Sequence, residues 1–329
     1  MRTILLAFGA ASLLGGAAPA SAAERCQMSA AEKAWIDRAL QASDHVMEQR
    51  LRLPVEARPT IILFNQHCRF EAKGSRQVRW AGLAHQGKIQ LPDGSDIDAG
   101  VTSFASQYEK TGKRYFVMAL PSVWEAAKMT IIGDNGLTGV FLHEFSHTRQ
   151  MNALKPVFEA ASAKYKMADD FNDDSLQKHF KSDPAYVAVI EKETDLLYRS
   201  AGEPDTTKAK ALAQQALALM EARQKRWFVG DETMWKPYDD LFLTMEGFGQ
   251  WNAYAWLSDP HGGGLTQAAA EAKMRGSRKW WSQEEGLALF LVIDRFVPGW
   301  SGQAFAAPPA LGIDLLKQAV SGQAKPPGT

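Results

Sequence analysis

The hydrophobic periodicity of the chain changes near Pro121, and this change restricts the folds that it can adopt. Over 54–121, apolar runs are short and end at turn-forming residues; "PTIILF" (59–64) and "RYFVMAL" (114–120) are typical of buried strands. After Pro121, apolar residues recur at helical spacing over long segments. We therefore predict an α+β fold, in which a small β-rich N-terminal lobe with a mixed or antiparallel sheet precedes a larger, mainly helical lobe.

Three further segments belong to the N-terminal lobe. Residues 29–51 are predicted to form a helix, because apolar residues recur at helical spacing and Ser29 with Glu32 has the spacing of a capping box. "GKIQL" (87–91) alternates and runs into the turn signal "PDG", which indicates one arm of a hairpin. Residues 98–112 fit either a strand or a helix.

The helical lobe contains several long helix patterns. They cover 134–155, 184–201, 205–228, 239–257 and 282–297. The first is expected to end before Pro156, since proline removes a backbone donor. Ser282 and Glu285 have capping-box spacing at the start of the last. The acidic run at 167–174 is expected to be a solvated loop. The alternative is a calcium site, although the ligand spacing of an EF-hand is absent.

The N-terminus is typical of a secretory signal peptide. Arg2 precedes an apolar stretch at 4–18, and a run of small residues predicts cleavage between Ala22 and Ala23. The alternative is an uncleaved N-terminal anchor. No other run is long and apolar enough to span a bilayer. We therefore expect an exported protein, periplasmic or secreted, with no membrane span in its mature part.

Cys26 and Cys68 are the two cysteines of the chain. In an oxidising compartment they are expected to form a disulfide, which would stabilise the fold by about 3–4 kcal/mol in the chain-entropy model. The alternative is a pair of buried thiols. Basic and acidic residues number 37 each, so net charge does not favour a nucleic acid or an anionic membrane as a partner.

The stretch "GVFLHEFSHTRQ" (139–150) contains two histidines four positions apart. Positions i and i+4 lie on one face of a helix, so His143 and His147 can present two imidazoles to one ion. Glu144 is rotated by about 100° from His143 and can reach a water on that ion without being a ligand. This spacing predicts a Zn²⁺ site. The alternative is two core histidines beside a surface glutamate, but the apolar surroundings would leave buried ionisable groups in need of partners.

A catalytic zinc site needs a third protein ligand and an open position. Glu246 lies in an apolar, aromatic-rich helix pattern, where an unpaired charge would be unfavourable and a bound cation would explain it. Glu191 and Asp195, one turn apart in "EKETD", could instead supply a ligand and a supporting carboxylate. A solvated helix face is the simpler interpretation of Glu191, Glu193 and Asp195, because basic residues lie among them.

The two segments together resemble the gluzincin superfamily of zinc metallopeptidases. The shared pattern is an H-E-x-x-H helix with a downstream glutamate, and "DLFLTMEGFGQW" is similar to the ligand segment of the aminopeptidase N family. The resemblance implies that His143, His147 and Glu246 bind Zn²⁺ in a zincin-like helical lobe. It also implies that Glu144 is the general base, and it favours Glu246 over Glu191 as the third ligand.

The resemblance covers two short segments and includes departures. Glu246 follows His147 by 99 positions, more than in the aminopeptidase branch, and the G-x-M-E-N motif is absent, so aminopeptidase activity is not implied. The E-x-x-x-D spacing at Glu191 resembles the thermolysin-type ligand segment. The likeness further implies that the strand at 114–120 is an edge strand that pairs with extended substrate. The chain also resembles exported bacterial proteins with this order of helices.

Two residues are candidates for stabilising the oxyanion of a hydrolytic reaction. Tyr254 lies two turns after Glu246, and His261 lies in the loop "DPHGGG". The alternatives are a core tyrosine and a loop histidine with no part in the chemistry.

The sequence thus predicts an exported zinc metallopeptidase, a hydrolase that acts on a peptide or protein substrate. Its expected parts are a signal peptide at 1–22, an N-terminal α/β lobe at 23–133 and a helical zinc-binding lobe at 134–329, the two lobes forming one catalytic unit. The alternative is a non-catalytic, zinc-containing binding or structural protein of the cell envelope. The sequence indicates no oligomeric state.

Overall fold

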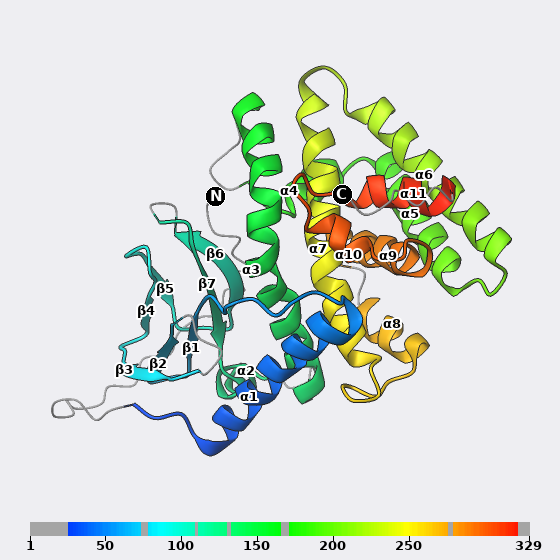
Figure 1. The fold of residues 1–329 in the computed structure, drawn as a ribbon. Coiled ribbons are helices and arrows are strands. Elements are labelled where there is room, and N and C mark those ends of the chain that lie inside the picture. Colours follow the sequence, from blue (N-terminus) through cyan, green and yellow to red (C-terminus); the bar gives the residue numbers. More distant parts are fainter. Residues whose placement is uncertain are drawn as a thin grey trace. The chain divides into compact units, whose positions relative to one another are not determined.

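The computed structural model describes residues 26–73, 78–108, 111–129, 133–165, 171–275 and 279–321. The fold is α+β, as predicted, with a mixed sheet in the N-terminal part and a mainly helical part after it (Figure 1). The predicted signal peptide and its cleavage site lie outside the described residues. No helix within these ranges is long and apolar enough to cross a membrane.

The chain divides into two compact units. The first comprises Met1–His45 and Pro54–Thr148, and the second comprises Val46–Leu53 and Arg149–Thr329. The division falls inside helix α3 (Gly133–Lys164), beyond the lobe boundary that we predicted at 133/134, because the first half of α3 packs against the sheet.

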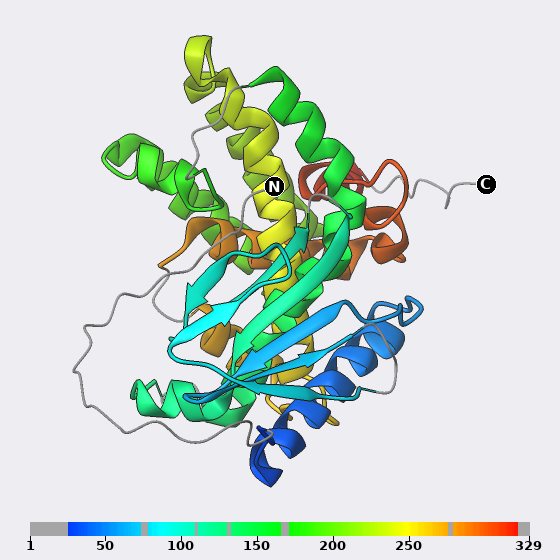
Figure 2. The same cartoon turned by 90° about the vertical axis from the view of Figure 1, so that its left-hand side faces the viewer.

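The first unit contains all the strands of the described residues. They are β1 (Thr60–Phe64), β2 (Cys68–Ala72), β3 (Ala81–Ala84), β4 (Lys88–Gln90), β5 (Asp96–Asp98), β6 (Ser103–Tyr108) and β7 (Lys113–Ala119). Five strands form one sheet in the order β3-β2-β1-β7-β6 (Figure 2). β1 and β7 are parallel, and the other neighbours are antiparallel. β4 and β5 form the predicted hairpin as a separate pair.

The strand pairing corrects one expectation and settles one open assignment. β7 pairs with β1 on one side and β6 on the other, so the expectation that 114–120 forms an edge strand is wrong. The edges of the sheet are β3 and β6. The segment 98–112, which fitted a strand or a helix, contains strand β6, whose first four residues are buried.

Helix α1 (Ala30–His45) begins where the sequence predicts it. The Ser29 N–H donates to Glu32 Oε2 at 3.0 Å and the Glu32 N–H donates to Ser29 Oγ at 3.2 Å, which confirms the capping box. A π-helical turn over Val46–Arg50 follows α1. The predicted Cys26–Cys68 disulfide is confirmed, and it joins the segment before α1 to strand β2.

Aromatic side chains hold α1 and the first half of α3 on one face of the sheet. The Phe116 ring of β7 lies 5.2 Å from the Phe141 ring and 5.3 Å from the Phe145 ring of α3, measured between centroids. Trp35 of α1 contacts Phe141 edge-on at 6.0 Å. These buried rings fix the position of α3 within the first unit.

Helix α3 is longer than predicted. Pro156 lies inside it and the helix continues to Lys164, so the expected stop before Pro156 is wrong. Proline removes one backbone hydrogen bond. Leu154 and Ala161, on either side of Pro156, are buried in a cluster with Tyr238 of the second unit, and this packing offsets the local loss.

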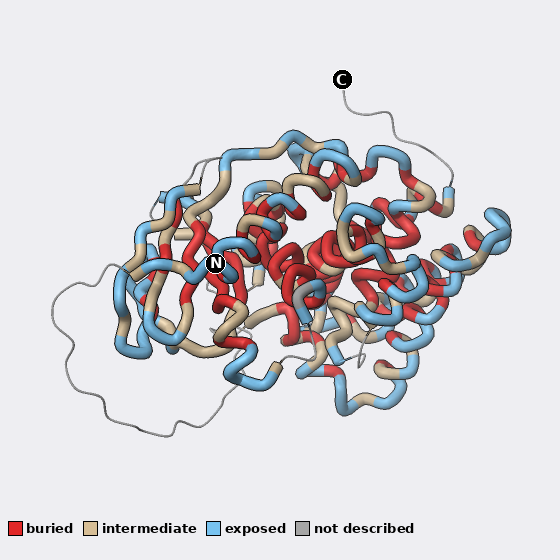
Figure 3. Tube along the Cα trace, turned by 90° about the horizontal axis from the view of Figure 1, so that it is seen from below, coloured by how far each residue is buried: buried red, intermediate tan, exposed pale blue. Residues whose placement is uncertain are grey.

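The second unit is helical. Besides the second half of α3 it contains α4 (Ser175–Phe180), α5 (Pro184–Gly202), α6 (Thr206–Trp227), a 3₁₀ turn (Gly230–Met234), α7 (Trp235–Leu257), α8 (Gln267–Arg275), α9 (Trp281–Phe296), α10 (Trp300–Ala304) and α11 (Gly312–Ser321). Among the helices of the second unit, α7 and α9 contain the most buried residues. Figure 3 draws the buried residues of the chain in red. The expected cap formed by Ser282 and Glu285 is wrong, because α9 has no side-chain cap and Glu285 points into the interior.

Candidate metal centre

Helix α3 carries His143, Glu144 and His147 in its first half. Phe141 and Phe145, four residues apart, stack on each other and face the sheet. Because successive helical residues are rotated by about 100°, the two histidines lie on a face roughly opposite to that of the two phenylalanines. The aromatic packing of one face therefore determines the direction in which the histidine pair points.

The three polar side chains converge at one point. The Nε2 atoms of His143 and His147 lie 3.2 Å apart, and their rings are nearly perpendicular at 88°. One ligand atom from each of His143, Glu144 and His147 lies within 4.8 Å of the others. Among the described residues, this is the one group of three or more histidine, cysteine or acidic side chains with such geometry. All three side chains are buried.

The separation of the two nitrogens fits a metal ion. Zinc–nitrogen bonds of about 2.0–2.1 Å in tetrahedral geometry place two ligand nitrogens about 3.3 Å apart. The observed 3.2 Å between Nε2 atoms agrees with this value. The same distance also suits a hydrogen bond in which one ring donates its N–H to the other, so the pair can bind a proton or a cation. A buried His143–Glu144–His147 group can thus bind a metal ion.

Hydrogen bonds fix the backbone of α3 around the group. The hydroxyls of Ser146 and Thr148 each donate at 2.7 Å, to the carbonyls of His143 and Phe145. Arg114 of β7 donates from Nη1 to the Thr148 carbonyl, also at 2.7 Å. The hydroxyl contacts lie within α3, and the Arg114 contact joins α3 to strand β7 of the sheet.

Glu246 lies in α7 and is buried, with 2% of its surface exposed. The amide Nε2 of Gln283 in α9 donates to Glu246 Oε2 at 3.3 Å. The burial of this carboxylate in an apolar helix agrees with the sequence analysis. Its role as a metal ligand stays a prediction.

Glu191, the alternative third ligand, lies on an exposed face of α5. Its neighbour Asp195 is half exposed and forms an ion pair with Arg275 at 3.4 Å. A solvated carboxylate needs no metal ion to balance its charge, so this exposure favours Glu246 over Glu191 as a ligand.

Tyr254 and His261 occupy different environments. Tyr254 is buried in α7, where desolvation is the main cause that raises its pKa, and the charge of Glu271 adds to the effect. His261 is exposed in the loop after α7, and its backbone N–H donates to Asp259 Oδ1 at 2.8 Å. The proposed roles of both residues at an oxyanion stay predictions.

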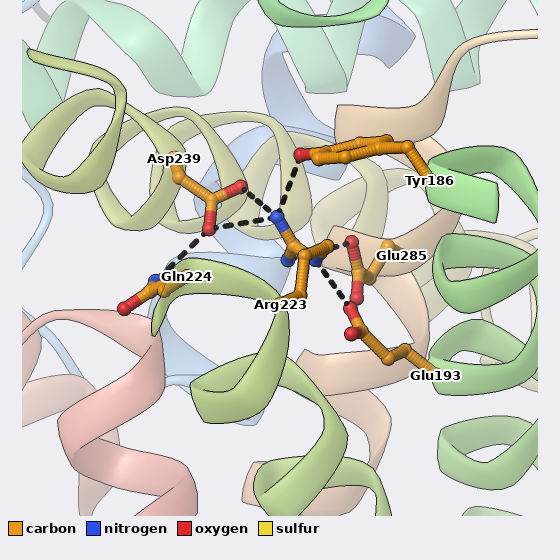
Figure 4. A network of polar contacts seen from close by, with 6 residues as sticks. All are labelled: Tyr186, Glu193, Arg223, Gln224, Asp239 and Glu285. Atoms are coloured by element: carbon orange, nitrogen blue, oxygen red, sulfur yellow. Dashed lines mark hydrogen bonds and ion pairs between the residues drawn. The ribbon is translucent and has the colours of Figure 1, made fainter. Parts of the chain in front are cut away.

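A second polar group is centred on Arg223 of α6 and was not predicted from the sequence (Figure 4). Arg223 is fully buried; its Nε donates to Glu193 Oε2 at 2.8 Å, and its Nη1 donates to both Asp239 oxygens at 3.1 Å. Nη1 also donates to the Tyr186 hydroxyl at 2.9 Å, and Nη2 lies 3.9 Å from Glu285 Oε2. The interpretation of Glu193 as part of a solvated helix face is wrong, because Glu193 is fully buried.

The charges of this Arg223 group do not balance. Three carboxyl groups face one guanidinium, so the buried group would have a net negative charge if all three were ionised. Burial raises the pKa of both Glu193 and Glu285, and a hydrogen bond between the two carboxyls raises that of Glu285 further. Burial alone would lower the pKa of Arg223, but the nearby carboxylates, Asp239 first, raise it well above its usual value. The pKa of Glu285 is therefore the one that the contact with Glu193 raises, and Glu285 holds a proton to higher pH than an exposed carboxyl does.

A small cavity of about 20 Å³ adjoins this group. Its lining includes Asp173, Asp239, Ser282 and Glu285, and it has room for a water molecule. Asp173 and its neighbour Asp174 are buried, so for these two residues the expected solvated acidic loop is wrong; residues 166–170 lie outside the described part. No local sequence pattern predicts this group, because its members lie on four helices. The partners of Arg223 lie at least 16 positions away from it in the sequence.

Comparison of the chain with protein-family models, with curated proteins and with solved structures found no match.

Proposed function

We propose that the protein is a zinc-dependent hydrolase that cleaves peptide bonds, with His143, His147 and Glu246 as zinc ligands and Glu144 as the general base. The observation that carries this proposal is the 3.2 Å separation of the two Nε2 atoms in a buried group that also contains Glu144. A structural metal site has no use for a carboxylate beside its ligands, whereas a hydrolytic site needs one.

In the proposed reaction, the metal ion and the side chains of the protein have different roles. When bound, Zn²⁺ would supply Lewis-acid polarisation and would lower the pKa of a water molecule to about 7. Glu144 would accept the proton of the attacking water and pass it to the leaving amine. Tyr254 or His261 would donate a hydrogen bond to the oxyanion.

Two observations within the second unit support Glu246 as the third ligand. Its carboxylate is 2% exposed, and such burial is expected for a ligand of a buried metal ion. Gln150, three residues after His147 in α3, donates to the carbonyl of Thr244, two residues before Glu246 in α7. The sequence likeness of the segment around Glu246 to a known zinc-ligand segment adds to these.

The metal content of the purified protein tests the proposal. Elemental analysis should find one zinc per chain in the wild type and in Glu191→Ala, and none in Glu246→Ala. The zinc-loaded wild type should cleave members of a mixed peptide library. A wild type that binds no zinc after reconstitution would refute the proposal. Bound zinc without cleavage would instead favour the alternative of a non-catalytic zinc protein.

We also propose that the protein is exported to the periplasm or secreted, with cleavage after Ala22. The Cys26–Cys68 disulfide supports this, because such bonds persist in oxidising compartments. N-terminal sequencing of the protein from the secreted or periplasmic fraction of a bacterial host should give Ala23 as the first residue. An N-terminus at Met1 would contradict export by a cleaved signal.

A further inference from the structure

Helices α7 and α9 touch backbone to backbone beside Glu246. A Cβ atom added to Gly247 would lie 2.5 Å from the Gly286 carbonyl oxygen, and one added to Gly286 would lie 2.7 Å from the Gly247 Cα. Only glycine at both positions permits this approach. Gly247 directly follows Glu246, and Gly286 lies one turn after Gln283, so the crossing brings the side chains of these two neighbours together.

Three polar side chains form a hydrogen-bonded chain at this crossing. Gln250, one turn after Glu246 in α7, donates from Nε2 to Gln283 Oε1 at 2.8 Å. Gln283, in the first turn of α9, donates from Nε2 to Glu246 Oε2 at 3.3 Å. An ionised carboxylate can only accept, so Gln283 must direct its N–H₂ toward Glu246 and its carbonyl oxygen toward Gln250. The arrangement fixes the orientation of the Gln283 amide.

We propose that Gln283 is a positioning residue for the zinc ligand Glu246, and that Gln250 acts through Gln283. This inference rests on the proposed function, since it concerns the ligand that the metal site requires. The hydrogen bond from Gln283 to Glu246 Oε2 restricts rotation of the carboxyl plane, and it thereby fixes the direction of the carboxylate. Partners of this kind orient metal ligands in many sites, and their loss typically weakens metal binding.

A purely structural role is the competing explanation. In that case Gln283 would only satisfy a buried carboxylate, and its loss would destabilise the metal-free protein without a specific effect on zinc. A positioning role predicts that loss of Gln283 weakens zinc binding, whereas a structural role predicts only a less stable metal-free protein. A positioning role also predicts that the effects of the Gln250 and Gln283 substitutions on zinc affinity are not additive.

The test compares Gln283→Ala, Gln250→Ala and the double variant with the wild type. The control is Gln215→Ala, an exposed glutamine of α6. The zinc dissociation constant is measured for the full chain by competition with a chromophoric chelator, and the melting temperature is measured on the metal-free protein. We expect Gln283→Ala to weaken zinc binding by about 10- to 100-fold. Gln250→Ala should weaken it less, and the double variant should equal Gln283→Ala alone, because Gln250 acts through Gln283.

The outcomes separate this inference from the proposed function. If Glu246→Ala abolishes zinc binding while Gln283→Ala and Gln250→Ala bind zinc like the control, the metal site stands and the positioning role is refuted. If the losses of zinc affinity in Gln283→Ala and Gln250→Ala add up in the double variant, Gln250 does not act through Gln283, and that part of the inference is refuted. If Glu246→Ala binds zinc like the wild type, both the ligand assignment and the positioning role are wrong. If Gln283→Ala does not fold, the zinc affinity of Gln250→Ala alone decides.

Discussion

Glu144 follows a proposed ligand in the chain, yet its role can be separated from metal binding. Glutamine at this position keeps the size and the hydrogen-bonding oxygen of the side chain but cannot accept a proton. We expect Glu144→Gln to retain zinc and to lose about 10²- to 10⁴-fold in the rate of peptide cleavage, the usual range for a general base. Zinc content and kcat/KM measured on the same sample provide the check.

Glu159→Gln is a suitable control, because Glu159 is an exposed carboxylate on the same helix. It should behave like the wild type in both measurements. Loss of zinc from Glu144→Gln would show that Glu144 binds the metal directly, and the assignment of the base would then be wrong.

Glu285 gives a prediction for the dependence of stability on pH. Burial, then the carboxyl of Glu193, raises its pKa well above the usual value, so the native state holds a proton that the unfolded chain releases above about pH 4.3. A raised acid pKa means that stability is greatest below the ordinary value and is lost as pH rises toward the raised one. One such proton increases the unfolding equilibrium constant by about tenfold per pH unit in that window.

Glu285→Gln should remove this dependence, because the glutamine amide donates to Glu193 as the protonated carboxyl does. Urea unfolding at several pH values from 5 upward should give a flatter profile for the variant than for the wild type. The matched control is Glu221→Gln, an exposed carboxylate on the helix that carries Arg223, and its profile should follow the wild type. Parallel profiles for all three proteins would mean that the proton is not shared in the native state.

At the residue scale, local patterns predicted what depends on local spacing. The histidine pair follows from i, i+4 geometry, and the burial of Glu246 follows from its apolar neighbours. The burial of Glu193 could not be predicted in this way, because its partner Arg223 lies 30 residues away on another helix. The charged residues next to Glu193 in the sequence are exposed, so the composition of the segment indicates a solvated face.

The crossing of α7 and α9 is the element-scale feature with the sharpest steric requirement. We expect Gly286→Ala to lower the free energy of unfolding by about 1–3 kcal/mol, because the added methyl meets backbone atoms of α7 that cannot move aside. Gly302→Ala is the control, since an added Cβ in α10 meets no atom within 4 Å. It should be neutral or slightly stabilising. Urea unfolding of both variants measures the difference; equal stabilities would contradict the close approach.

Elements were predictable where they bury one clear face. The helix at 29–51, the strands at 59–64 and 114–120 and the hairpin at 87–91 were found from periodicity and turn signals. Strands β2 (Cys68–Ala72) and β3 (Ala81–Ala84) were missed, because β2 has charged residues at alternate positions and β3 is short and mostly exposed. Their pairing with β1 and with each other, rather than their own composition, makes them strands.

At the scale of the whole molecule, the Cys26–Cys68 disulfide closes a loop across a sequence separation of 42 residues. In the chain-entropy model a loop of this size stabilises the folded state by about 4 kcal/mol. We expect the Cys26→Ser, Cys68→Ser double variant to lose roughly that amount in urea unfolding, and the reduced wild type to behave like it. An oxidised wild type no more stable than the reduced form would contradict the prediction.

The early segment Val46–Leu53 belongs to the second unit, although the chain passes through it before it forms the sheet. Arg50 Nη1 donates to the Ala255 carbonyl at 3.1 Å, and Ser301 Oγ donates to the Leu51 carbonyl at 2.7 Å, across 205 and 250 residues. A ribosome therefore releases this segment long before its partners exist. The first unit can close once Thr148 has emerged, whereas the second must wait for Ser301, so the first unit can complete its folding earlier.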